Sequence, residues 1–216
     1  MNELTPVKER TNGHKQTTRS RQTELRAAQA LFVRERAQGW AALNDLFRTG
    51  SVPEPPLNGH YAGKLVALDI APGFTQFFQW LANTWMPWRG KTFDAAHQAG
   101  DNFFTKDSYL LARMFNPFYR GFVEDRPGTY RGFAFRTYLA PGLVDADRRV
   151  LKIDYNLQEN PALTVQRVLD ELVQLDHDLY LGKAHVRWWW GGWQTVAYFS
   201  LTHNMESGTA RKGVLP

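Results

Sequence analysis

Ionisable side chains alternate with apolar ones in two segments of the C-terminal half, and this spacing suggests acid–base chemistry. In LKIDY, Lys152 and Asp154 point to one face of an extended chain, while their apolar neighbours point to the other. Lys183, His185 and Arg187 share a face in the same way. If the two segments are neighbouring strands, Asp154 would orient the imidazole of His185 for proton transfer, with Lys152 beside it.

Two interpretations of this polar face remain open at the level of the sequence. In the first, Lys152, Asp154 and His185 are catalytic residues of an enzyme that acts on an apolar substrate. In the second, the face is an ordinary solvated surface with cross-strand ion pairs, which regular alternation favours. The two differ in whether the face is concave, so the sequence leaves open whether the protein is an enzyme.

Aromatic residues are the second feature that suggests a site, because phenylalanine, tyrosine and tryptophan make up 14% of the chain. Tryptophans flank Gly191-Gly192, in a segment that predicts a β-hairpin with a two-residue turn. That turn would place Trp190 opposite Trp193, with Trp188 on the same face. The result would be an aromatic wall, suited either to packing in a core or to lining a pocket.

We predict an apolar cavity that is lined by aromatic rings and has two polar anchors for a bound molecule. The anchors are Lys91 and Asn102. The ligand-binding rings are those of Tyr61, Phe77, Trp85, Trp88, Phe103, Phe133, Trp188 and Tyr198. The alternative is that these rings only pack against one another.

Motifs for several other chemistries are missing from the sequence. The chain has no cysteine, which excludes disulfides, thiolate metal sites and cysteine nucleophiles. It has no phosphate loop and no GxGxxG, HExxH or GxSxG motif. His97 and Asp101 are four residues apart, but no third ligand accompanies them. We therefore expect neither a metal ion nor another cofactor.

The net charge of +5 is concentrated outside the predicted folded body. Residues 1–22 hold five basic and two acidic side chains and predict a disordered basic tail, and residues 205–216 predict a flexible C-terminal tail. The basic tail could dock on an acidic partner, but the nearly neutral body disfavours a specific nucleic-acid function. Neither a signal peptide nor a transmembrane segment is evident, so we expect a cytoplasmic protein. A homodimer is left open.

Hydrophobic periodicity predicts one α+β domain over residues 57–204, preceded by an N-terminal helix within residues 23–50. Helical spacing of apolar residues predicts three further helices, at 73–85, 106–115 and 161–175. Strands are predicted at 59–70, 88–93, 129–140, 148–156, 179–190 and 193–202. This order favours a curved antiparallel sheet, or a partly closed β-barrel, covered by about three to four helices.

Two short motifs carry a resemblance to a known family. GHYAG at 59–63 has the form of a Gly-x-Trp-x-Gly element with tyrosine in the central position, and WRGKTF at 88–93 matches a W-x-GK-x-F element. The chain thereby resembles a group of small uncharacterised bacterial proteins named for their GxWxG motif. The resemblance implies a lipocalin-like, calycin-type body with an apolar interior, and no settled activity.

These observations together predict an intracellular binding protein. Its ligand would be a small hydrophobic or aromatic molecule, such as a lipid or an aromatic metabolite, held in an aromatic-lined cavity. The alternative is an enzyme that acts on an apolar substrate through Asp154 and His185.

Overall fold

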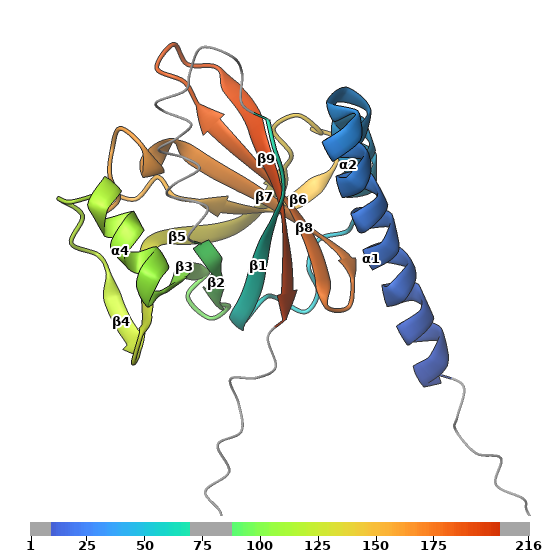
Figure 1. Ribbon diagram of the computed structural model, residues 1–216, viewed down its shortest axis with the longest axis horizontal. Coiled ribbons are helices and arrows are strands. Elements are labelled where there is room, and N and C mark those ends of the chain that lie inside the picture. Colours follow the sequence, from blue (N-terminus) through green and yellow to red (C-terminus); the bar gives the residue numbers. More distant parts are fainter. Residues whose placement is uncertain (1–9, 70–87, 204–216) are drawn as a thin grey trace, which may run out of the picture.

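The computed structural model describes residues 10–69 and 88–203, and at its centre is a nine-stranded antiparallel sheet (Figure 1). The strand order is β3-β2-β1-β9-β8-β7-β6-β5-β4, and β3 also pairs with β5. Every strand except β4 therefore belongs to a closed barrel. The strands are β1 (Gly59–Leu68), β2 (Trp88–Asp94), β3 (Ala99–Thr105), β4 (Val123–Arg126), β5 (Thr129–Pro141), β6 (Arg149–Asp154), β7 (Val168–Asp176), β8 (Leu179–Arg187) and β9 (Trp193–His203).

Helices lie on two sides of this barrel, which confirms the predicted α+β class (Figure 1). The first two, α1 (Arg10–Arg34) and α2 (Arg36–Arg48), pack together, and α1 contacts β1 and β7. On the other side, α4 (Lys106–Phe115) contacts β3 and β5 and coincides with the helix predicted at 106–115. The helix predicted at 73–85 lies outside the described residues. Within the described ranges, no helix combines the length and the apolar character needed to cross a membrane.

The N-terminal helical region differs from its prediction in two ways. The single helix predicted within 23–50 is interrupted at Glu35, so that two helices form. Gly39 allows a close approach at this break, because a Cβ atom there would collide with the backbone of Phe32. In addition, α1 begins at Arg10, inside the segment 1–22 for which a disordered tail is predicted.

The main error of the secondary-structure prediction lies at residues 161–175. Their apolar spacing predicts a helix, but the structure has a short 3-10 helix, η1 (Val165–Arg167), followed by β7. The prediction fails because residues 168–173 of β7 are all buried, so that apolar side chains follow no two-residue period. One face of β7 lines the barrel interior, and the other lies on the outside of the wall.

Two apolar cores lie on opposite sides of the barrel wall. The inner apolar core fills the barrel and includes the rings of Tyr61, Phe93, Phe104, Phe135 and Phe199. The outer apolar core lies between the barrel and the helices α1 and α2, and it includes Leu43, Phe47, Val66, Val173, Leu181 and Tyr198. Alternate residues of one strand are therefore buried in two different surroundings.

The hairpin of β8 and β9 exists, but its turn is longer than predicted. Arg187, rather than Trp190, lies opposite Trp193 in the register. Residues 188–192 form the loop, in which the N–H of Trp188 donates a 2.8 Å hydrogen bond to the carbonyl oxygen of Gly192. Trp188 is buried in the inner apolar core, whereas Trp190 is 58% exposed and stacks on it at 4.9 Å. The predicted wall of three tryptophans is therefore not formed.

Candidate functional site

Four polar side chains lie together inside the barrel, within the inner apolar core. Lys91 on β2 and Asn102 on β3 are register partners, so their side chains emerge next to each other. Asp170 comes from β7, on the opposite side of the barrel in the strand order, and Tyr155 directly follows β6. All four residues are buried. We call them the inner polar cluster.

Nζ of Lys91 is the centre of the inner polar cluster. It lies 3.0 Å from Oδ2 of Asp170 and donates a 3.0 Å hydrogen bond to Oδ1 of Asn102. It donates a further, short hydrogen bond to the hydroxyl oxygen of Tyr155, and that hydroxyl donates to Oδ1 of Asn102 at 3.0 Å. An ammonium group has three N–H donors, so these three acceptors use all of them.

Aromatic rings surround the ammonium group of Lys91. The distance from Nζ to the ring centroid is 5.0 Å for Tyr155, 5.2 Å for Trp88, 5.3 Å for Phe199 and 5.4 Å for Phe135. A cation near the face of an aromatic ring is attracted by the ring quadrupole. This attraction offsets part of the hydration that the buried charge loses.

Burial changes the ionisation of the inner polar cluster. Loss of hydration lowers the pKa of Lys91 and raises the pKa of Asp170, although the attraction between the two charges opposes both shifts. Burial, followed by the negative charge of Asp170, holds the pKa of Tyr155 well above its ordinary value. Clusters of titratable groups that are perturbed in this way and border a cavity are typical of functional sites.

A small cavity adjoins the inner polar cluster. Its apolar walls are Trp88, Phe104, Phe133, Phe199, Val165 and Val168. Its volume of about 20 Å³ is space for about one water molecule, so the barrel is largely filled by its own side chains. Two buried polar atoms of lining residues, Oδ1 of Asp170 and Nε1 of Trp88, have no hydrogen-bond partner among the described residues.

Two backbone features position the rings of the cavity. The register of β3 and β5 shifts at Phe133, whose φ of 53° is rare for an aromatic residue and whose N–H donates a 2.7 Å hydrogen bond to the hydroxyl of Tyr119. Such a bulge re-aims a side chain, here that of Phe133 into the barrel. On β1, Gly63 lies against the indole of Trp88, where a Cβ atom would collide with the ring.

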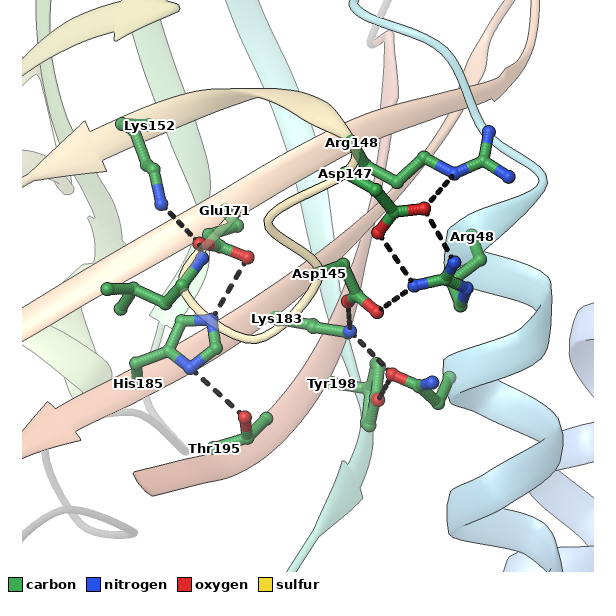
Figure 2. Close-up of polar contacts among 12 residues, drawn as sticks. Arg48, Asp145, Asp147, Arg148, Lys152, Glu171, Lys183, His185, Thr195 and Tyr198 are labelled. Carbon is green, nitrogen blue, oxygen red and sulfur yellow. Dashed lines mark hydrogen bonds and ion pairs between the residues drawn. The ribbon is translucent and has the colours of Figure 1, made fainter. Parts of the chain in front are cut away.

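A second group of buried charged side chains lies on the outer surface of the barrel wall (Figure 2). Glu171 on β7 accepts a short hydrogen bond from Lys152 on β6 and a 2.6 Å hydrogen bond from the backbone N–H of Leu143. Its other carboxylate oxygen lies 3.2 Å from Nε2 of His185 on β8. Nδ1 of His185 lies 3.0 Å from Oγ1 of Thr195. We call Lys152, Glu171 and His185 the outer polar cluster.

The contacts of the outer polar cluster keep Glu171 ionised. Burial by itself would raise the pKa of Glu171. The imidazole of His185 at 3.2 Å, together with the hydrogen bonds from Lys152 and the Leu143 N–H, lowers this pKa to about 2. The carboxylate is therefore compensated by its neighbours.

The loop between β5 and β6 covers this part of the wall. Asp145 of the loop forms a short ion pair with the buried Lys183 on β8, and Arg48 on α2 pairs with the same carboxylate (Figure 2). Lys183 also donates a 2.6 Å hydrogen bond to Oδ1 of Asn44 on α2. Loop, helix and barrel are thereby joined, and solvent is excluded from the outer polar cluster.

The structure does not assemble the predicted site of Lys152, Asp154 and His185. The prediction requires β6 and β8 to be neighbours, but β7 lies between them. His185 therefore contacts Glu171, whereas Asp154 pairs with Arg136 at 2.7 Å. All three side chains lie on the outside of the wall. This face is therefore not the concave site of the enzyme hypothesis. Cross-strand ion pairs form on it, as the second interpretation expects, and the pair of Asp154 with Arg136 is partly exposed. Lys152 and His185, in contrast, are buried rather than solvated.

Part of the predicted ligand-binding set does meet at the cavity. Trp88, Lys91, Asn102 and Phe133 line it. Tyr61 and Trp188 belong to the same inner apolar core but are not among its lining residues.

Other members of that set lie elsewhere. Tyr198 points outward and packs edge-on against Trp40 of α2, with 4.8 Å between the ring centroids. The two neighbours of Phe103 on β3 face inward, so Phe103 itself faces outward. There its ring lies beside that of His60, with 6.0 Å between the ring centroids. Phe77 and Trp85 are outside the described residues.

Sequence reasoning missed Asp170 and Tyr155. The alternation in LKIDY already places Tyr155 on the opposite face from Lys152 and Asp154. That face also carries Leu151 and Ile153, so its apolar character indicated that it faces the interior. Asp170 was hidden by the helix predicted at 161–175. The detectable signal was a pair of carboxylates in the middle of an apolar, β-branched segment.

Metal-ligating groups are not gathered in the part of the chain that the structure describes. No set of three or more histidine, aspartate or glutamate side chains there could hold a metal ion. His97 pairs with Asp94 at 2.7 Å, and Asp101 pairs with Arg131 at 2.6 Å. The spacing of His97 and Asp101 therefore does not correspond to a shared site.

Comparison with known proteins identifies no relative. No protein-family model matches the sequence, and neither a curated protein nor a solved structure matches it. The class of the protein is therefore defined by its own fold: an α+β antiparallel barrel with a buried polar cluster among aromatic rings.

Proposed function

We propose that the chain binds a small, mostly apolar or aromatic molecule in the barrel interior, at the cavity beside the inner polar cluster. The observation that carries this proposal is the ion pair of Lys91 and Asp170. The pair is buried among aromatic rings and has a carboxylate oxygen without a hydrogen-bond partner among the described residues. Ligand pockets have this composition, with apolar and aromatic walls and a few placed polar groups.

Stability alone does not account for the pair. Each charge that leaves water loses several kcal/mol of hydration, and apolar replacements of buried pairs are often neutral or stabilising. The pKa shifts of Lys91 and Asp170 indicate that the lost hydration outweighs their attraction. A binding role explains why a costly polar cluster is kept beside a cavity.

A bound molecule has to displace at least one ring. The cavity of about 20 Å³ is far smaller than the roughly 300 Å³ at the lower end of ligand pockets. Trp88 is the best candidate, because it is only partly buried whereas the other rings at the cavity are buried. Its indole lies against Gly63 and packs edge-on against the ring of Phe199, with 5.6 Å between the ring centroids. A tilt of this indole that keeps its Nε1 at the cavity would enlarge the space.

The resemblance to GxWxG-motif proteins is part of the same proposal. Its two motifs, 59–63 and 88–93, lie on the paired strands β1 and β2. Gly63 of the first motif lies directly against Trp88 of the second. The motifs thus meet at the cavity, which fits a lipocalin-like carrier.

Fluorescence titration with the neutral apolar dye N-phenyl-1-naphthylamine tests the proposal. We expect saturable binding at one site per chain, because the barrel has one interior. Val168→Phe should abolish the signal, since Val168 is buried at the cavity. Val144→Phe is the matched control, because it adds the same ring at a loop position that is 66% exposed.

Circular dichroism is measured on each variant to verify folding. If Val168→Phe does not fold, Val165→Phe takes its place, because Val165 lines the same cavity from η1. A wild-type protein without saturable binding would refute the proposal. Equal binding by the folded cavity variant and by Val144→Phe would refute it as well, since the dye would then bind elsewhere.

A further inference from the structure

We infer that the ligand enters the cavity with a neutral hydroxyl group, which donates a hydrogen bond to Asp170 and accepts one from Trp88. This inference rests on the proposed function and specifies its ligand. It follows from a comparison of the polar atoms at the cavity that have hydrogen-bond or ion-pair partners within the protein with those that have none.

Lys91 is not the group that meets the ligand. Its N–H donors are used by Asp170, Asn102 and Tyr155. A buried lysine in an apolar barrel would ordinarily suggest recognition of a carboxylate. Here the anion that compensates the lysine is part of the protein, namely Asp170.

Two buried polar atoms of the cavity that lack hydrogen-bond partners are complementary to a hydroxyl group. Oδ1 of Asp170 is an acceptor and Nε1 of Trp88 is a donor; both are buried and lack partners among the described residues. A hydroxyl group has a donor and two acceptor lone pairs, so it matches one of each. Its size also fits, because about 20 Å³ holds a group the size of a water molecule.

Charged groups match the cavity less well. A carboxylate would approach the carboxylate of Asp170, and like charges repel strongly where water is excluded. An ammonium group would place a second cation near Lys91 and would offer no acceptor to the indole N–H of Trp88. The cavity therefore selects against both charges.

A series of ligands with one scaffold and different polar groups tests this inference. The probes are naphthalene, 2-naphthol, 2-naphthoate and 2-naphthylmethylammonium, and their affinities are measured at pH 7 by competition with N-phenyl-1-naphthylamine. We expect 2-naphthol to bind about tenfold more tightly than naphthalene, because it gains hydrogen bonds to buried groups. Both charged probes should bind more weakly than naphthalene.

Trp88→Phe assigns the preference to the cavity. It removes the indole N–H and keeps an aromatic ring, so the advantage of 2-naphthol over naphthalene should fall severalfold while naphthalene still binds. Trp40→Phe is the matched control, because it removes an indole N–H in the outer apolar core and should leave the preference unchanged. Asp170→Asn, where it folds, should weaken the discrimination against 2-naphthoate.

The outcomes separate the inference from the proposed function. If neither the dye nor naphthalene binds, the proposed function fails. If naphthalene binds and 2-naphthol has no advantage, or 2-naphthoate binds best, the inference is overturned while the binding function stands. A preference for 2-naphthol that Trp88→Phe and Trp40→Phe leave equally intact would also overturn it.

Discussion

Asp170 and Glu171 are consecutive residues of β7, and the barrel wall places their carboxylates in two different buried environments. Asp170 points inward to Lys91 and has an oxygen without a hydrogen-bond partner among the described residues. Glu171 points outward, where its Oε1 accepts hydrogen bonds from Lys152 and from the backbone N–H of Leu143. Its Oε2 also lacks a hydrogen-bond partner among the described residues, but it lies 3.2 Å from Nε2 of His185. Both residues are fully buried, so the difference between them lies in their partners.

The two carboxyl groups differ in the direction of their pKa shifts. Burial raises the pKa of Asp170, and Lys91 compensates only in part. Burial acts in the same direction on Glu171, but its partners prevail and lower that pKa to about 2. At neutral pH, ionisation of the Glu171 carboxyl group therefore favours the folded state, whereas ionisation of the Asp170 carboxyl group disfavours it. The difference supports the proposed binding role of the inner polar cluster and a structural role for the outer polar cluster.

The largest effect is expected from single replacements in the inner pair. Lys91→Met or Asp170→Leu alone should lower the free energy of unfolding by about 3–5 kcal/mol, because each leaves a buried charge without its counter-ion. The double variant should recover most of this loss, since an apolar pair needs no hydration. Guanidinium chloride unfolding of the wild type, the two single variants and the double variant gives this double-mutant cycle. If the double variant is as unstable as the sum of the singles, the inner pair stabilises the fold and the contrast with Glu171 disappears.

An effect of about 3 kcal/mol is expected from the pH dependence of Glu171. The folded-state pKa of about 2 lies below the ordinary 4.5, so this stabilisation is complete above about pH 4.5 and is lost as the pH falls toward 2. Glu171→Gln should therefore be less stable than wild type at pH 6 and approach it at pH 3. Urea unfolding at several pH values measures the difference.

The exposed Glu159→Gln serves as the control and should follow the wild-type pH curve. The pH dependence that comes from Asp170 has the opposite direction, because its pKa is raised. The stabilisation that comes from protonated Asp170 is lost as the pH rises above about 4. A constant difference between wild type and Glu171→Gln at all pH values would contradict the assignment of Glu171.

The smallest effect is expected at Asp154, the third carboxylate of this region. Its partner Arg136 has a side chain that is 56% exposed, so their ion pair is screened by water. Arg136→Gln should change the free energy of unfolding by less than about 1 kcal/mol. Unfolding in low and high salt measures this change. A loss above about 2 kcal/mol would mean that Asp154 belongs energetically to the outer polar cluster.

Local patterns predicted several elements of the fold well. The helix at 106–115, the strands around Tyr61 and Lys152 and the β8–β9 hairpin all formed, because their periodicity or turn residues acted within a few neighbours. Lys91 and Asn102 do line an interior cavity. Their role as anchors for a ligand stays a prediction.

Other features depended on contacts distant in the sequence. The turn around Gly191 became a loop of residues 188–192, so the predicted pairing of Trp190 with Trp193 did not form. The strand β7 was not recognised, because burial on both faces removes the alternation that identifies a strand. That single error hid Asp170 and placed His185 beside the wrong carboxylate.

The sequence by itself determined the α+β class, the alternation that separates the two faces of each strand, and the supply of aromatic rings. Only the tertiary structure decided which face of each strand is the interior, because closure of the barrel through β3 and β5 is a long-range pairing. Closure also brought Asp170 to Lys91 across the barrel and left Glu171 outside. The physical reason is that a strand defines two faces locally, whereas the surroundings of each face are set by the elements that pack against it.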